Sequence, residues 1–274
     1  MGKNIHWFPG HMQKALRKIK EALKNVDVVI ELSDARAPES SRNKLLLSLI
    51  AHKPHLLVLT KEDLADKAAL ERYRAINNVI SGNLYDQQFM NRIKAKINEI
   101  GAPVFERQKR RGMKRQPLTA LVLGIPNVGK STFINRLARE NRASVANRPG
   151  HTRGQQYIKV SNDLALIDTP GVLEPNYADK TITMHLALIG TIPSEILPTN
   201  KMADYLLTYL KAHYFELLQG RYKLSDASLT NYEILKEIAK VRNFVGPEYE
   251  QIERAENLLL HEFKNGLIGR VSLE

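Results

Sequence analysis

The residues Gly124 to Ser131 have the spacing of a loop that binds phosphate groups. Their sequence is G-x-x-x-x-G-K-S, between an apolar run that predicts a strand, residues 118–123, and a helical pattern at residues 132–137. Glycines let successive backbone N–H groups close around phosphate oxygens, and the helix adds its positive N-terminus. Lys130 can reach the β- and γ-phosphates in a catalytic role, and the Ser131 hydroxyl can ligate Mg²⁺. Because both flanks fit, a chance glycine loop is a poor alternative. The predicted nucleotide contacts are Asn127, Val128, Gly129, Lys130, Ser131 and Thr132.

Two downstream segments carry the other groups that a triphosphate and its metal ion need. The apolar run at residues 164–167 predicts a strand that ends at Asp168, whose carboxylate can hold Mg²⁺ through water. Gly171 follows in D-T-P-G and can give its N–H to the γ-phosphate. In the polar loop between the two motifs, Thr152 can close on Mg²⁺ and the γ-phosphate. The sequence therefore predicts a magnesium site at Ser131, Thr152 and Asp168, with Thr152 also a catalytic candidate.

The segment that would recognise the base lies upstream of the phosphate loop. An apolar run at residues 56–59 precedes Thr60, Lys61 and Asp63, which form the pattern T-K-x-D. The Asp63 carboxylate can accept hydrogen bonds from the N1–H and amino group of guanine, which adenine does not offer. An unmatched polar pair in such a site is costly, so the motif discriminates sharply between the two bases. T-K-x-D alone is often only a turn. After a buried strand, in a chain with a phosphate loop, it predicts guanine recognition.

The order of these motifs resembles that of the circularly permuted GTPases. In ordinary GTPases the base-recognition motif follows the phosphate loop, whereas here it precedes it. Three further segments narrow the resemblance to the ribosome biogenesis GTPase A family, which acts late in large-subunit assembly. These are residues 6–12 (HWFPGHM), residues 34–38 (DARAP) and residues 40–43 (SSRN). The resemblance is specific through residue 172, returns in the last twenty residues and is weaker between.

The resemblance implies roles for residues that the motifs alone do not assign. A glutamine often follows D-x-x-G and orients the attacking water, but this chain has Val172 there, which cannot hydrogen-bond a water. The family implies that His11, on a mobile N-terminal segment, takes over this catalytic role, and His151 is the rival by position. Asn127 matches the residue that ligates K⁺ in potassium-dependent relatives. Asn77 and Asn78 are aligned with the loop that covers the guanine, although an ordinary strand end is an equal alternative.

Composition limits the class of protein and its partners. The chain has 274 residues, a formal net charge of +12 and no cysteine, which excludes disulfides, thiolate zinc sites and a cysteine nucleophile. The basic balance favours a polyanionic partner. No apolar run approaches the roughly 20 residues that span a bilayer, and no signal-peptide core is present. We therefore expect a cytoplasmic protein that needs no membrane and no oligomer.

Two segments are candidates for contact with ribosomal RNA. Residues 107–115 carry six basic residues in nine, and they are either a solvated linker or a strip that holds RNA phosphate. Beyond Gly171, helical patterns occur at residues 181–190, 200–219, 229–241 and 248–265, separated by proline and glycine. This helical region is either a structural cap or, as the resemblance implies, a second rRNA contact.

The predicted fold class is α/β. A circularly permuted P-loop GTPase domain, with a mixed sheet and helices on both faces, spans residues 1–178, and an α-helical C-terminal domain spans residues 179–274. Within the first domain we expect a helix at residues 87–99 and a short extended piece at Ala102–Phe105. The expected function is hydrolysis of GTP, slow alone and faster on particles, with Mg²⁺ and K⁺, to gate a late step of 50S subunit assembly. A P-loop ATPase or kinase, and an RNA-associated module whose nucleotide is structural, are the alternatives.

Overall fold

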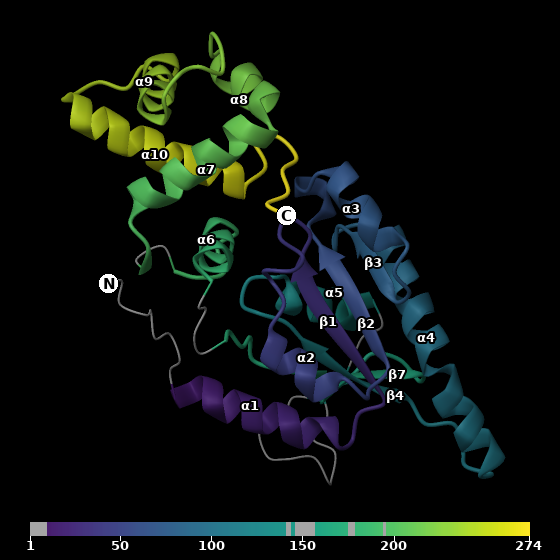
Figure 1. The fold of residues 1–274 in the computed structure, drawn as a ribbon. Coiled ribbons are helices and arrows are strands. Elements are labelled where there is room, and N and C mark those ends of the chain that lie inside the picture. The colour runs from purple at the N-terminus through teal and green to yellow at the C-terminus, as the bar shows by residue number, and fades with distance from the viewer. Residues whose placement is uncertain (1–9, 141–143, 146–156, 175–178, 194–195) are drawn as a thin grey trace.

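A seven-stranded mixed sheet forms the centre of the N-terminal part of the chain (Figure 1). The computed structural model describes residues 10–140, 144–145, 157–174, 179–193 and 196–274. The strand order is β3-β2-β1-β4-β7-β6-β5; the first five strands are parallel and the last two pairings are antiparallel. The strands are β1 (Val28–Asp34), β2 (His55–Thr60), β3 (Val79–Gly82), β4 (Leu118–Leu123), β5 (Ser144–Val145), β6 (Tyr157–Lys159) and β7 (Leu164–Asp168). The strands β1 and β4 are buried along their whole length, as near-continuous apolar runs predict for a sheet covered on both faces.

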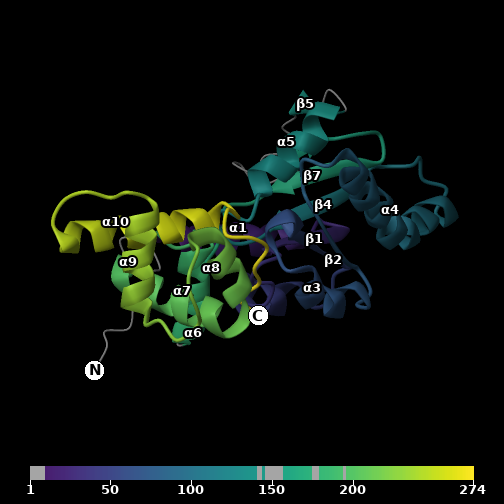
Figure 2. The same cartoon turned by 90° about the horizontal axis from the view of Figure 1, so that it is seen from above.

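Helices cover both faces of this sheet. On one face lie α1 (Gly10–Leu23), α2 (Lys44–Ile50) and α3 (Lys67–Arg74), whose apolar side chains pack with residues such as Val29, Leu57 and Leu121. On the other lie α4 (Gln87–Arg110) and α5 (Lys130–Glu140), packed against residues such as Ile30 and Val122. Figure 2 shows β7, β4, β1 and β2 side by side in this order, with α5 next to β7 and α3 next to β2. The predicted fold class is confirmed.

The helix α4 differs from the sequence-based expectation. We expected it to end near residue 99, with Ala102–Phe105 extended, but the helix continues through Pro103 to Arg110. Its first half is anchored by buried Phe89, Met90 and Ile93, Gly101 is still buried against the sheet, and the residues from Glu106 to Arg110 are mostly exposed. It ends before Gly112, which has φ +64°, the left-handed conformation that commonly terminates helices. About half of the basic segment at residues 107–115 is therefore helical.

From Lys180 onward the described chain contains helices and no strand. The helices are α6 (Lys180–Leu188), α7 (Thr199–His213), α8 (Phe215–Tyr222), α9 (Asn231–Val241) and α10 (Glu248–Lys264). Three predicted helices are confirmed, whereas the helix predicted over residues 200–219 is two helices that meet at Tyr214. The boundary predicted at residue 179 coincides with the N-cap of α6, where Asp179 accepts a hydrogen bond from the Thr181 N–H. The division into two domains stays a prediction.

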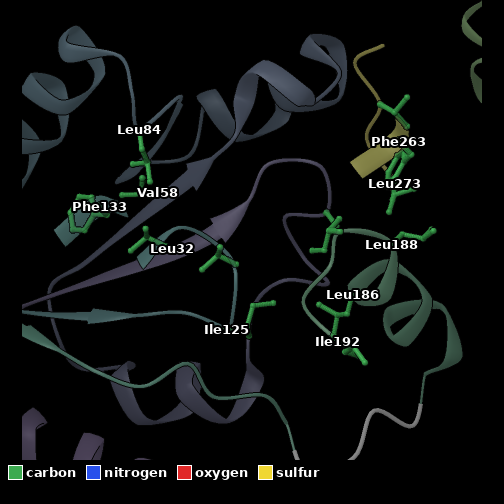
Figure 3. Close-up of a cluster of buried hydrophobic side chains, with 14 of the residues drawn as sticks. Leu32, Val58, Leu84, Ile125, Phe133, Leu186, Leu188, Ile192, Phe263 and Leu273 are labelled. Carbon is green, nitrogen blue, oxygen red and sulfur yellow. The ribbon is translucent and has the colours of Figure 1, made fainter. Parts of the chain in front are cut away.

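The sheet and the helical part share one buried apolar cluster. Figure 3 shows it running from Leu32 and Phe133, at the sheet, to Leu186 on α6 and Leu273 near the C-terminus. The C-terminal segment also bonds to two loops of the sheet through its backbone. The Val271 N–H donates to the Leu64 carbonyl at 3.0 Å, and the Leu273 N–H donates to the Arg36 carbonyl at 2.7 Å. Apolar burial and backbone hydrogen bonds thus both join the two parts.

Candidate nucleotide-binding site

The candidate site lies where the carboxyl ends of the parallel strands meet. In the register of the sheet, Asp34 of β1 lies opposite Thr60 of β2, and Val122 of β4 lies opposite Asp168 of β7. The chain leaves β1 and β4 toward opposite faces, because the helix that follows β1 covers one face and the helix that follows β4 covers the other. Open α/β sheets bind ligands at such a switch point. The sheet therefore brings the phosphate loop, T-K-x-D and D-T-P-G together at the carboxyl end of its parallel strands.

The phosphate loop has the backbone conformation that its glycines and Asn127 allow. Gly124, Asn127 and Gly129 have φ values of +150°, +63° and +100°. A Cβ on Gly124 would lie 2.7 Å from the Leu32 carbonyl oxygen, so only glycine fits against β1 there. The helix α5 begins at Lys130 and directs its N-terminal N–H groups into the loop. This arrangement is suited to an anion.

Lys130, Asp168 and Gly171 lie together beside this loop. The Lys130 Nζ donates to the carbonyl oxygens of Gly124 and Ile125 at 3.1 and 2.8 Å. Burial lowers the pKa of Lys130 to about 8, although the charge of Asp168 acts in the opposite direction. Burial likewise raises the pKa of Asp168, and Lys130 opposes that shift. A Cβ on Gly171 would lie 2.9 Å from both the Lys130 Nζ and the Pro126 backbone nitrogen, so glycine allows D-x-x-G to approach the phosphate loop this closely.

Ser131 and Asp168 fit a magnesium ion that is bound together with phosphate. Ser131 is exposed at the start of α5, and Asp168 is a partly buried carboxylate whose pKa is raised by burial. Among the described residues no group of three or more His, Cys, Asp or Glu side chains could hold a metal ion, so an ion at Ser131 and Asp168 would need phosphate oxygens and water to complete its shell. Thr152, the third predicted ligand, lies outside the described residues.

T-K-x-D is attached directly to the phosphate loop. The buried Thr60 Oγ1 donates to the Val128 carbonyl oxygen at 2.7 Å. The Lys61 Nζ donates to the Asn127 carbonyl oxygen at 3.0 Å and to the Asp34 carboxylate at 2.8 Å. Asp63 follows in a one-turn 3₁₀ helix, η1 (Glu62–Leu64), and is exposed; no hydrogen bond to its carboxylate is found among the described residues. Asp63 is therefore available to a base placed beside the loop.

The structure contradicts the placement of Asn77 and Asn78 at the base. These residues precede β3, and the Asn78 carbonyl accepts a hydrogen bond from Leu57, near the amino end of β2. Because β2 and β3 are parallel, Asn77 and Asn78 lie at the amino end of the strands, opposite to the candidate site. The loop after β3, residues 83–86, lies at the carboxyl end of the strands, where the candidate site is. A Cβ on Gly129 would lie 2.9 Å from Leu84 in that loop, and the Tyr85 carbonyl accepts from Arg136 of α5 at 3.1 Å.

The sequence does hold a signal for this second loop. Residues 79–81 are a short apolar and polar run before Gly82 and Asn83, which is typical of a strand followed by a turn. The strand is only four residues long, and the preceding Asn-Asn pair resembles a loop more strongly. Register, which depends on the pairing of β3 with β2, resolves the choice.

The residues assigned to the attacking water are placed only in part. The Val172 side chain is buried against α1 and α2, and its carbonyl accepts from the Asn43 side chain at 2.9 Å. It presents no polar group to the site, as predicted. His11 belongs to the first turn of α1, and its side chain is outside what the structure describes. His151 is likewise outside the described residues.

Asn127 has a second partner in the helical part of the chain. Its Nδ2 donates to the Gly190 carbonyl oxygen at 2.7 Å, just beyond the end of α6. The Thr191 hydroxyl next to it donates to the Pro126 carbonyl at 3.3 Å. The Asn127 amide oxygen has no hydrogen bond to any described residue, so it is free to ligate a cation.

Comparisons with known proteins agree with this geometry. A family model described as "50S ribosome-binding GTPase" matches residues 119–243. Over 98% of the chain, ribosome biogenesis GTPase A of Bacillus cereus is 40% identical and that of Bacillus pumilus is 36% identical, and the alignments cover 93% and 98% of those proteins. A solved structure described as GDP-bound YlqF superposes with a TM-score of 0.66 at 25% identity, over 94% of this chain and 98% of that one. No helix among the described residues is long and apolar enough to cross a membrane.

Proposed function

The chain belongs to the ribosome biogenesis GTPase A family, which makes it a GTP hydrolase of ribosome assembly, and we propose that GTP binding and hydrolysis gate its docking on a precursor of the 50S subunit. One observation carries the nucleotide site. Thr60 of the base-recognition motif donates to Val128 of the phosphate loop at 2.7 Å, so both motifs form one surface despite their permuted order. The GTPase family excludes the ATPase and kinase alternative.

In the proposed complex the phosphates lie in the loop from Gly124 to Lys130, and the guanine lies between Asp63 and residues 83–86. Ser131 and Asp168 would hold Mg²⁺, with Thr152 as a third ligand. The ion would neutralise charge on the phosphate oxygens. Lys130 and the N-terminus of α5 bind the same oxygens from the protein side.

Water activation is proposed to depend on groups other than the residue after D-x-x-G, because the Val172 side chain is buried. We assign the orientation of the water to His11 when a ribosomal particle docks, with His151 as the next candidate. Asn127 is proposed to ligate K⁺ through its amide oxygen, while Gly190 accepts from its nitrogen. Such an ion would add positive charge against the γ-phosphate, where charge develops during transfer.

The partner is proposed to be the rRNA and proteins of the 50S precursor. The exposed C-terminal end of α4, residues 106–110, carries basic residues away from the sheet, and the helical part after residue 179 provides a second surface (Figure 1). A chain with a net charge of +12 gains affinity for RNA by releasing counterions from phosphate. We propose the cytoplasm as the compartment in which the chain would meet such a precursor.

The decisive experiment measures phosphate release with and without purified 50S particles. We expect slow release alone and faster release on particles in KCl, with a smaller increase in NaCl at equal ionic strength. His11→Ala should keep its affinity for GTP and lose most of the increase, because it acts on the transition state only. The exposed His52 is the matched control, and His52→Ala should behave like the natural chain.

Each part of the proposal fails on a different outcome. Equal rates with and without particles would show that particles do not stimulate the enzyme. A full increase in His11→Ala would transfer the role to His151 or to a ribosomal group. Equal rates in KCl and NaCl would remove the potassium site and leave the remainder intact.

A further inference from the structure

The carboxylate of Asp34 is a buried charge at the end of β1 that the proposed reaction does not use. The residue is fully buried, and its two oxygens accept three side-chain hydrogen bonds. Arg36 donates to Oδ1 at 3.0 Å through Nε and to Oδ2 at 2.9 Å through Nη2. Lys61 donates to the same Oδ2 at 2.8 Å. Burial raises the pKa of Asp34, but the charges of Arg36 and Lys61 outweigh it and hold the pKa at about 2. The group is therefore an anion at physiological pH.

Arg36 fixes this anion from the side away from the site. The residue is 1% exposed, and its Nη1 donates to the Lys264 carbonyl oxygen at the end of α10 at 3.1 Å. The guanidinium carbon lies 5.8 Å from the centre of the Phe263 ring. A bidentate pair held by a helix end leaves the carboxylate little freedom. The position of Asp34 is thus set by β1 and by α10 together.

Lys61 is the residue on which this fixed anion acts. It has a left-handed backbone with φ +60°, an uncommon conformation outside glycine, and it is the residue that starts the 3₁₀ turn bearing Asp63. Its ammonium group bridges Asp34 and the Asn127 carbonyl of the phosphate loop. A side chain that is tied at both ends holds its own backbone, and the turn that follows, in one conformation.

We propose that Asp34 is the positioning residue of the base-recognition loop: it holds Lys61 against the phosphate loop so that Asp63 faces the base in one orientation before nucleotide arrives. This inference rests on the guanine site proposed above. Such a preorganised loop raises the affinity for the nucleotide, because ordering a loop during binding costs free energy that a loop already ordered does not lose. The effect acts on the base, so GTP and GDP should be affected alike.

The test compares Asp34→Asn with a second buried carboxylate of the same strand. Glu31 is 4% exposed and is paired with Arg42 at 3.0 Å, but it contacts no part of T-K-x-D. Affinities for GTP and GDP are measured by titration calorimetry at a temperature where circular dichroism shows every variant folded. Asp34→Asn should weaken both nucleotides by the same factor, roughly 10- to 100-fold, the range for removal of a hydrogen bond between charged groups. Glu31→Gln should lower the melting temperature and leave both affinities unchanged.

A double-mutant cycle shows whether Asp34 acts through Lys61. Lys61→Met should weaken both nucleotides, and adding Asp34→Asn to it should cause little further loss. Full additivity of the two effects, or natural affinity in Asp34→Asn, would overturn the inference. If Asp34→Asn does not fold, Asp34→Glu keeps the charge and lengthens the arm, and it should lose affinity while staying folded; unchanged affinity would overturn the inference equally. If the natural chain fails to prefer GTP over ATP, the proposed guanine site itself is wrong.

Discussion

At the scale of single residues, the site depends on charged side chains whose interactions within the chain leave them able to bind a nucleotide. Asp63 is exposed, with no hydrogen bond to its carboxylate among the described residues, although its neighbours Thr60 and Lys61 are both bonded to the phosphate loop. Lys130 is the reverse case, a cation whose burial lowers its pKa. The Asp63 carboxylate is available to a base, and the charged form of Lys130 is stabilised when an anion binds beside it. Each leads to a measurable expectation.

Asp63→Asn should exchange the base preference of the site. An amide presents a donor where guanine also presents donors, so GTP affinity should fall about a hundredfold or more while xanthosine triphosphate gains. Competition between the two nucleotides for one labelled analogue measures the change. The matched control is Asp66→Asn, because Asp66 caps α3 through the Ala68 N–H at 2.9 Å, outside the motif. Unchanged GTP affinity in Asp63→Asn would show that the base lies elsewhere.

Affinity for GTP should fall as pH rises through the pKa of Lys130, which is about 8 in the nucleotide-free chain. Phosphate binds the ammonium form, so binding raises this pKa and takes up protons; above pH 8 that protonation costs affinity. Between about pH 7.5 and about pH 8.8 the protonated fraction, and with it the affinity, should fall about fivefold. Calorimetry in buffers of different ionisation enthalpy detects the proton uptake. Lys130→Arg stays charged and should show no such fall, and a flat profile in the natural chain would contradict the lowered pKa.

At the scale of elements, local pattern predicted what local forces decide. The strand, loop and helix from Leu118 to Glu140 follow from an apolar run, glycines and helical spacing, and the structure has all three. Pattern failed where interactions distant in sequence decide. We expected a helix only at residues 87–99, but α4 continues over Leu118, whose side chain would lie 2.1 Å from a Cβ on Gly101. The glycine therefore permits close packing and does not end the helix.

The same limit explains the two other differences. The helix expected over residues 200–219 is interrupted at Tyr214, whose hydroxyl donates to Asp66 at 3.1 Å and to the Ser272 carbonyl at 3.2 Å. Neither partner is near in sequence. Asn77 and Asn78 resemble a loop that contacts the guanine base, but the pairing of β3 with β2 puts them at the amino end of the strands, away from the site. The three motifs that follow a recognised strand, T-K-x-D, the phosphate loop and D-T-P-G, lie together at the carboxyl end of the sheet.

The exposed end of α4 carries the prediction that belongs to this scale. Arg115 stacks on Phe105 at 4.0 Å and pairs with Asp163 at 2.8 Å, so its charge is partly used. The exposed Lys109, Arg110, Arg111 and Lys114 are the better test, and changing all four to Gln should weaken binding to 50S particles. The slope of log affinity against log salt should become shallower by about 0.7 to 0.9 for each phosphate that the variant no longer neutralises. The rate of hydrolysis without particles should not change.

A control for this variant is available outside both proposed RNA surfaces. Arg74 at the end of α3 is paired with Glu71 and Lys96 in the first half of α4 is paired with Glu99, at 2.5 and 2.8 Å, and their change to Gln should leave the salt slope unaltered. If the α4 variant keeps its affinity and its slope, residues 107–115 only connect α4 to β4. Contact with RNA would then have to come from the helices after residue 179.

At the scale of the whole molecule, the two parts are connected at the nucleotide site as well as through the core. Gly190, at the end of α6, accepts from Asn127 of the phosphate loop, and Lys264, at the end of α10, accepts from Arg36 beside the base-recognition loop. Both hydrogen bonds lie next to groups that the nucleotide would touch. We expect a change of nucleotide state to reach the helices through these two hydrogen bonds, and docking of the helices to act back on the nucleotide site through them.

The shared core leads to the last prediction, which concerns cooperative unfolding. Leu273 is 2% exposed and lies among the apolar side chains that join α10 and α6 to the sheet (Figure 3). Leu273→Ala should lower the free energy of unfolding by about 2 to 5 kcal/mol, because it leaves a cavity at this junction. Leu267, in the same segment, is 50% exposed, and Leu267→Ala should cost less than about 0.5 kcal/mol. Calorimetry of the natural chain should give one transition, since neither part can lose this core without exposing the other. Two separate transitions, or equal stability of the two leucine variants, would show that the sheet and the helices fold independently and that the contacts between them are too weak to transmit the state of the nucleotide.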